Sequence, residues 1–180
     1  MSNPTFVHLD VNTQYSLGRS TIRQDQLIDV CVDMGMPAVG VTDHNNLFSA
    51  YKLYKSSQKK GIKYIIGSTV TLLDQKERIK SKLSLLCENE NGYKNLCALI
   101  TQSYTEKLDK NEPLIDRKWL ESRTEGLIAI SSSNNGYLQQ SKSMDESMAL
   151  QWINGLQELF PDRLFVSISR MGIPNEEKLN

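Results

Sequence analysis

The sequence lacks any segment suited to crossing a membrane or directing export. Its 180 residues contain no unbroken apolar run of roughly 18 residues, and the opening MSNPTF has neither a basic start nor an apolar centre. We therefore expect a cytoplasmic protein that contacts no membrane.

Cysteine and histidine are scarce. The three cysteines, Cys31, Cys87 and Cys97, lie far apart and form no CxxC pair, which argues against a disulfide scaffold and against a zinc knuckle. Because each lies in an apolar periodic segment, we predict buried, reduced thiols. The two histidines, His8 and His44, cannot build a multinuclear metal centre by themselves.

An excess of charge of either sign is also missing. Lys plus Arg and Asp plus Glu both number 21, so no overall field draws the chain toward nucleic acid or an anionic membrane. The local group Lys55, Lys59, Lys60 and Lys63 is typical of a solvated helix end, and contact with DNA phosphates is the alternative. Aromatic residues interleaved as in single-strand binding proteins are not evident.

The chain contains no linker, no repeat and no low-complexity tract, and strand-like patterns alternate with helix-like ones. Strands are predicted over residues 5–11, 37–43, 62–73, 81–88, 126–132 and 163–169. Helices are predicted over 24–35, 47–61, 92–107, 116–122 and 145–160, with Gly35 and Gly61 as stops. This order predicts one α/β domain built of βα units.

Two features near the end of the sequence bear on its organisation. The helix predicted over 145–160 has an apolar stripe that includes Trp152, which is typical of core, with a docking surface as the alternative. The tail PNEEKLN resembles the first turn of a helix, so we expect a fragment of a longer chain, with a short native tail as the alternative.

Polar side chains gather where predicted strands end. Three clusters contain the metal-capable and amide side chains: His8, Asp10 and Asn12; Asp43, His44, Asn45 and Asn46; and Ser131 to Asn135. The carboxyl ends of parallel strands meet at one edge, and imidazole with carboxylate suits zinc or manganese. The pattern therefore indicates a metal centre.

Each cluster also has a structural interpretation. Asp-His-Asn-Asn after a strand is typical of a turn in which Asn46 caps the next helix, and SSSNNG is typical of a turn. His8 on a strand is typical of a hydrogen-bonded core histidine. The residues alone leave both interpretations open.

Six blocks carry a resemblance to a known family: FVHLDVNTQYSL, MPAVGVTDHNNLFSAYKLYKSSQKKGIKYIIGSTV, LLCENENGYKNL, EPLIDRKWL, EGLIAIS and FPDRLFVSISRMGIPNEE. In this order and spacing they resemble the N-terminal polymerase-and-histidinol-phosphatase (PHP) domain of bacterial replicative DNA polymerase III alpha subunits. The resemblance implies a distorted (βα)7 TIM-like barrel, truncated here, with residues 1–180 forming its first part and the polymerase core lying beyond Asn180.

The resemblance also implies where metal ligands would fall. His8 matches the first histidine of the family's His-X-His motif and His44 matches the histidine of its TDH motif. The second histidine of the first motif falls on Asp10, which is still able to bind a metal. If any metal binds, the resemblance assigns it to these three residues.

Other ligand positions are occupied by residues that do not suit a metal. The aspartate of the family's following loop falls on Arg19 and a glutamate falls on Thr69. A histidine falls on Lys82, and a cysteine falls on Ser133. A guanidinium cannot deprotonate to coordinate an ion, and clustered divalent ions need anionic ligands to offset their repulsion.

We therefore expect a vestigial site with no metal and no catalytic residue. Arg19 and Lys82 are predicted to form salt bridges with Asp10 and Asp43. Asn12 and Asp43 are predicted to be supporting residues of the vestigial site.

The resemblance implies a structural and interaction platform that docks the proofreading exonuclease subunit and other polymerase III holoenzyme subunits. It implies that this chain holds no cofactor. It also implies a longer parent protein, of which this chain is the first part, that contacts DNA and holds Mg²⁺ at its polymerase site. The parent would be a DNA-directed DNA polymerase, a nucleotidyltransferase. The alternative is an active metal-dependent phosphoesterase or 3′–5′ exonuclease, in which His8, Asp10 and His44 hold metal and activate a water.

Overall fold

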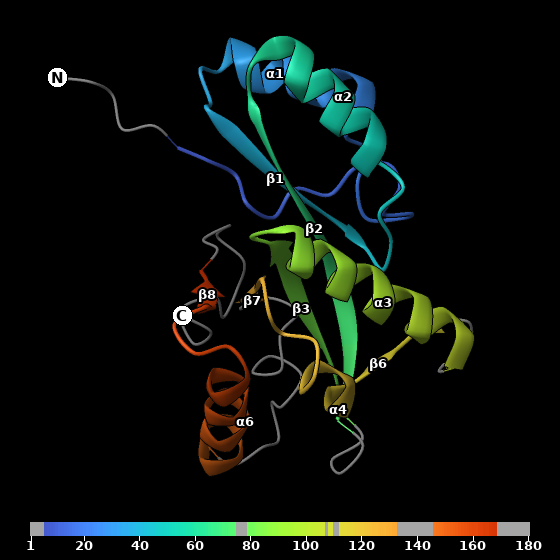
Figure 1. Ribbon diagram of the computed structural model, residues 1–180, viewed down its shortest axis with the longest axis vertical. Helices are drawn as coiled ribbons and strands as arrows, with labels where there is room; N and C mark the ends of the chain where they lie inside the picture. The colour runs from blue at the N-terminus through green and yellow to red at the C-terminus, as the bar shows by residue number, and fades with distance from the viewer. Residues whose placement is uncertain (1–5, 75–78, 107, 110–111, 133–145, 169–180) are drawn as a thin grey trace, which may run out of the picture. The chain divides into compact units, whose positions relative to one another are not determined.

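The computed structural model describes residues 6–74, 79–106, 108–109, 112–132 and 146–168 (Figure 1). The chain divides into two compact units, unit 1 (Met1–Thr69) and unit 2 (Val70–Asn180). The division falls inside the strand β2 (Lys63–Asp74), which therefore contributes residues to both units.

Unit 1 contains a pair of parallel strands with two helices packed beside it. β1 (Ala38–His44) pairs with the first part of β2, from Ala38 opposite Lys63 to His44 opposite Thr69. The helices α1 (Gln24–Asp33) and α2 (Ala50–Lys60) lie side by side (Figure 1). Their apolar faces and the strands share one buried cluster: Leu27, Ile28, Cys31, Val39, Val41, Leu53 and Ile62.

A glycine with positive φ follows each helix of unit 1, which confirms the stops predicted from the sequence. Gly61 is the C-cap of α2 with φ +71°, and Gly35 follows α1 with φ +69°. This left-handed conformation costs glycine little because it has no Cβ. α2 begins later than predicted, at Ala50, because the residues from Asn45 to Ser49 form turns first.

The strand predicted over residues 5–11 is wrong for the described residues 6–10. Regular pairing is limited to a parallel bridge between Val11 and Val41. The segment still runs along β1, since Gly40 N–H donates to the His8 carbonyl (2.7 Å) and Val11 N–H donates to the Gly40 carbonyl (3.1 Å). A Cβ on Gly40 would lie 2.9 Å from the Cα of Leu9, so only glycine allows this approach.

Unit 2 is built on a mixed sheet. β3 (Ile79–Cys87) pairs antiparallel with β7 (Leu127–Ser132), and β7 pairs parallel with β8 (Leu164–Ser167). β2 neighbours β3 and also pairs parallel with the short strand β6 (Ile115–Asp116). Among the described strands, β8 is an edge strand that pairs with β7 on one side, so the sheet is open. The α/β class is confirmed.

The described part of unit 2 also contains two further short strands and three helices. β4 (Leu108–Asp109) and β5 (Glu112–Pro113) pair antiparallel with each other. The helices are α3 (Glu90–Glu106), α4 (Arg117–Leu120) and α6 (Glu146–Leu159). No helix in the described part of the chain has the length and apolar character needed to span a membrane.

α3 begins against the turn that precedes β7. The Asn89 side chain caps the helix by accepting the Gly92 N–H at 3.1 Å, and Gly126 closes the turn with φ +69°. A Cβ on Gly92 would lie 1.8 Å from the Gly126 carbonyl oxygen. At this point the helix and the turn therefore meet backbone to backbone, and Asn95 Nδ2 adds a bond to the Glu125 carbonyl at 2.9 Å.

The predicted amphipathic stripe of α6 is core. Trp152 and Leu156 are 4% and 1% exposed, and Phe160, just after the helix, is fully buried.

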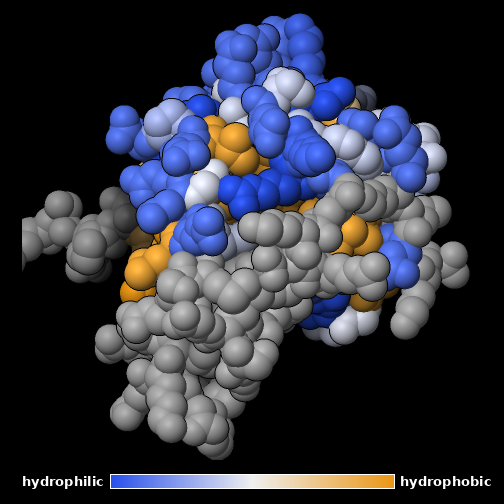
Figure 2. Space-filling model, turned by 90° about the horizontal axis from the view of Figure 1, so that it is seen from below, coloured by the Kyte–Doolittle hydropathy of each residue, from blue (hydrophilic) through white to orange (hydrophobic). Residues whose placement is uncertain are grey.

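The face seen in Figure 2 is mainly hydrophilic among the described residues, with hydrophobic residues in small patches.

The three cysteines are free thiols, as predicted, but only Cys31 is buried. Cys87 and Cys97 are half-buried. Burial is the main cause that raises the pKa of the Cys87 thiol to about 12, and the nearby Cys97 adds to it. Cys87 is therefore protonated and weakly nucleophilic at neutral pH.

Candidate functional site

The carboxylate of Asp43, at the end of β1, is enclosed by hydrogen-bond donors. Thr13 donates from its backbone N–H (2.7 Å) and from its hydroxyl (2.8 and 2.9 Å). Ser16 and Ser49 donate from their hydroxyls at 2.8 and 2.6 Å. Asp43 is only 1% exposed, so these charge-assisted bonds replace its water shell.

This arrangement corrects one prediction. Asp43 was expected to pair with Arg19 or Lys82, yet among the described residues its partners are the backbone and hydroxyl groups of Thr13, Ser16 and Ser49. The Asp43 carboxylate joins the loop after residue 12, the end of β1 and the start of α2.

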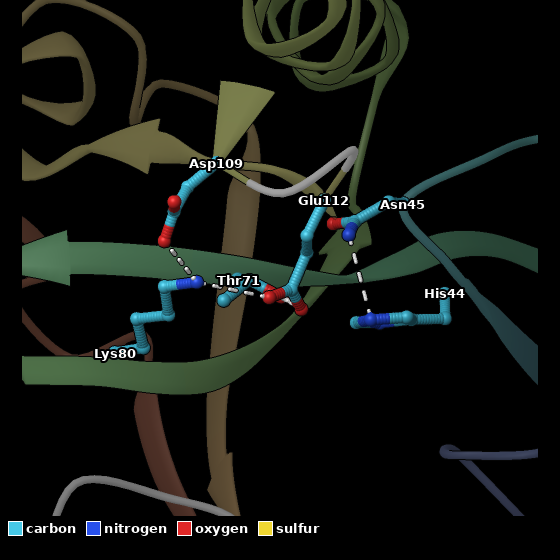
Figure 3. Close-up of polar contacts among 6 residues, drawn as sticks. All are labelled: His44, Asn45, Thr71, Lys80, Asp109 and Glu112. Carbon is cyan, nitrogen blue, oxygen red and sulfur yellow. Dashed lines mark hydrogen bonds and ion pairs between the residues drawn. The ribbon is translucent and has the colours of Figure 1, made fainter. Parts of the chain in front are cut away.

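The imidazole of His44 is engaged through both ring nitrogens. Its Nδ1 lies 3.1 Å from the Thr69 carbonyl oxygen, and its Nε2 lies 3.4 Å from Nδ2 of Asn45 (Figure 3). A carbonyl only accepts, so Nδ1 carries the proton and Nε2 accepts from the Asn45 amide. The lone pair that would bind a metal thus faces a hydrogen-bond donor.

Asn46 stabilises a turn rather than capping α2. Its Oδ1 accepts the Phe48 N–H at 3.1 Å, while its Nδ2 donates to the carbonyls of His44 and Tyr15 at 2.9 and 3.1 Å. The turn interpretation of this cluster is confirmed, but the predicted cap is wrong because Ser49 occupies the N-cap of α2.

Asp10 and Asn12 both bind the strand β1 at Thr42. The Thr42 hydroxyl donates to Asp10 Oδ1, and Asn12 Nδ2 donates to the Thr42 carbonyl at 2.7 Å. The Thr69 hydroxyl lies 3.5 Å from the same oxygen of Asp10. Asp10 and Thr69, two of the predicted site positions, are therefore neighbours.

A pocket of about 410 Å³ opens beside these residues in unit 1. Its polar lining includes His8, Asp10, Asn12 and Arg19, and its apolar lining comes largely from α1 and the residues that follow it. His8 is exposed and packs edge-to-face on Phe6, with ring centroids 4.8 Å apart, so the core-histidine interpretation is wrong. The structure thus brings four predicted residues together.

The residues in this pocket do not fit a metal cluster. Within the described part of the chain, no three His, Cys, Asp or Glu side chains are grouped so as to hold a metal ion. Arg19 lines the same pocket as His8 and Asp10, and its guanidinium has no lone pair to offer. Of the remaining predicted positions, Lys82 lies on β3 in unit 2 and is half-buried, and Ser133 lies outside the described residues.

Unit 2 contains an ion cluster that sequence reasoning missed. Lys80 Nζ lies 2.8 Å from Asp109 Oδ2 and 3.3 Å from Glu112 Oε2, and the Thr71 hydroxyl donates to Glu112 Oε1 at 3.1 Å (Figure 3). The bond to Asp109 is the main cause that raises the pKa of Lys80. Nothing in the sequence marked this cluster, because Lys80 lies just before the strand predicted over residues 81–88. Its acidic partners Asp109 and Glu112 lie on two-residue strands without periodicity.

Residues 8–171 match the family model described as the PHP domain. DNA polymerase III subunit alpha of Pseudomonas aeruginosa is 36% identical over 180 residues, which cover 97% of this chain and 15% of that protein. The alpha subunit of Escherichia coli K12 is 35% identical over 179 residues, which cover 98% of this chain and 15% of that protein.

Solved structures share the fold. A protein of Bifidobacterium adolescentis described as a metal-dependent phosphoesterase aligns with a TM-score of 0.63 at 11% identity, over 98% of this chain and 82% of that one. An amidohydrolase of Chromobacterium violaceum aligns with a TM-score of 0.57 at 10% identity, over 85% of this chain and 74% of that one. The chain spans about 15% of the length of the curated relatives it matches. It belongs to the PHP domain family and is related to the N-terminal region of DNA polymerase III alpha subunits.

Proposed function

We propose that this chain forms the first part of the PHP domain of a DNA polymerase III alpha subunit and serves there as a structural and interaction domain. The support is the 36% identity across 97% of the chain. The complete domain would close into a distorted (βα)7 barrel. The parent would be a cytoplasmic nucleotidyltransferase with Mg²⁺ at its polymerase site.

The metal site of this domain is degenerate in our proposal, and Arg19 is the observation that carries it. This residue lines the pocket that is also lined by His8 and Asp10. A fixed positive charge there repels a divalent ion and takes the place of a ligand. His44 supports the same conclusion, because its Nε2 accepts from Asn45 instead of facing an open position.

Calorimetric titration of the 180-residue chain with Zn²⁺ and Mn²⁺ tests this proposal. We expect no stoichiometric binding at micromolar concentration. As a matched variant, Asp10→His combined with Arg19→Asp restores the ligand types implied by the family, and we expect it to bind more tightly than the natural chain. Stoichiometric micromolar binding by the natural chain would overturn the proposal and favour the phosphoesterase alternative.

The partners we propose are the proofreading exonuclease subunit and other subunits of the polymerase III holoenzyme, with DNA contacted through the parent. Co-purification of the chain with the purified exonuclease subunit tests the docking role. Failure of the two to co-purify would contradict docking, while leaving the result of the metal titration unaffected.

A further inference from the structure

The outward face of α2 combines aromatic and basic side chains. Leu53 and Ser57 are fully buried, so the opposite side of the helix faces solvent. We call the exposed set the aromatic–lysine face; it consists of Phe48, in the turn just before the helix, and of Tyr51, Lys52, Lys55 and Lys59 on the helix. Residues 51, 55 and 59 follow one another at four-residue spacing and therefore form one line along the helix.

The rings of this face are unusually open to solvent. Phe48 and Tyr51 are each 69% exposed. Tyr15 contacts Phe48 edge-on, with ring centroids 6.0 Å apart, and leaves most of the ring uncovered. Tyr54 is 51% exposed on the flank of the same helix. Flat apolar rings in water favour a partner that can stack on them.

Positive charge accompanies the rings. α2 contains Lys52, Lys55, Lys59 and Lys60 and no acidic residue. Lys60 bonds Asp29 of α1 at 3.1 Å and so belongs to the helix pair rather than to the face. Lys55 Nζ lies 5.4 Å from the Tyr51 ring centroid, which places ring and charge within reach of one ligand.

We propose that the aromatic–lysine face binds single-stranded nucleic acid, with bases stacking on the rings and phosphates contacting the lysines. The aromatic rings suit the bases, because every base has a π-face, and the lysines suit the phosphates, because every phosphate is anionic. A protein partner fits less well, since lysine is depleted from the centres of protein interfaces. Tyr51 to Lys59 extends about 12 Å, enough for a few nucleotides.

The inference departs from the expectation that aromatic residues are not interleaved as in single-strand binding proteins. It also goes beyond the proposed function, in which DNA is contacted through the rest of the longer protein. It uses residues of unit 1 alone and does not depend on whether the pocket beside His8 holds a metal. The neutral net charge of the chain means that binding must be local and sensitive to salt.

Fluorescence anisotropy of a labelled oligothymidylate of about 20 nucleotides, titrated with the 180-residue chain at low salt, tests the proposal. We expect binding that Tyr51→Ala weakens by about fivefold to a hundredfold, through loss of stacking. Lys55→Ala combined with Lys59→Ala should weaken binding. It should also reduce the slope of the logarithm of the binding constant against the logarithm of the salt concentration by about 1.4.

The matched controls are Tyr104→Ala and Lys94→Ala, which remove the same residue types from exposed positions of α3. They should leave binding unchanged. No binding by the natural chain, equal losses in the controls, or displacement of the oligonucleotide by polyglutamate as readily as by unlabelled oligothymidylate would each overturn the proposal. The last result would show that the face responds to negative charge alone.

Discussion

Asp43 retains a buried carboxylate because protein donors take the place of water. Replacing one of its oxygens by an NH₂ group in Asp43→Asn sets a donor against the hydroxyls of Thr13, Ser16 or Ser49. We expect the free energy of unfolding to fall by about 1–3 kcal/mol, the usual cost of an unsatisfied buried polar group. Urea unfolding followed by circular dichroism measures this loss.

Asp33→Asn is the control for this substitution, because Asp33 is exposed on α1. It should change the free energy of unfolding by no more than about 0.5 kcal/mol. Equal stability of the two variants would show that the donors around Asp43 rearrange without cost.

The position of Asp43 was predictable from the sequence, whereas its partners were not. A carboxylate after a β-branched run indicates a strand end, and the strand is there. Thr13 and Ser16 are separated from Asp43 by 30 and 27 residues. No local pattern marks such hydroxyls, because they become neighbours of Asp43 only when the loop folds over β1.

At the scale of elements, the contact between α3 and the turn at Gly126 leaves no room for a side chain. In Gly92→Ala the new methyl group would meet the Gly126 carbonyl, so helix or turn must shift. We expect a loss of about 1–3 kcal/mol in the free energy of unfolding, despite the better helix propensity of alanine. Thermal and urea unfolding of the variant measure it.

Ala98→Ser, at an exposed position of the same helix, should stay within about 0.5 kcal/mol of the natural chain. If Gly92→Ala proved as stable as this control, the close approach would not be rigid.

The helices were predictable because apolar periodicity marks them, and glycines mark where α1 and α2 end. The strands were predictable where they are long and buried. β4, β5 and β6 were missed because two-residue strands have no periodicity. The N-terminal segment has the alternation of a strand, yet its described residues, from Phe6 on, form a single bridge beside β1.

At the scale of the whole chain, the strand β2 contributes residues to both units. Lys63 to Thr69 pair with β1, and Leu72 and Leu73 pair with β6. Unfolding of either unit removes partners from a strand that the other unit needs. We therefore expect one cooperative transition.

Both tryptophans, Trp119 and Trp152, lie in unit 2, so their fluorescence reports on that unit, whereas far-UV circular dichroism reports on both. The urea midpoints from the two signals should coincide. A fluorescence transition clearly separated from the dichroism transition would show that the units unfold independently.

The sharing of β2 also bears on how genes for such domains change in length. Side chains alternate along its 12 residues, so one inserted or deleted codon would turn every later side chain to the opposite face of the sheet. Insertions and deletions that survive in relatives are therefore expected in the codons for the connections, and the reading frame through β2 should keep a constant length.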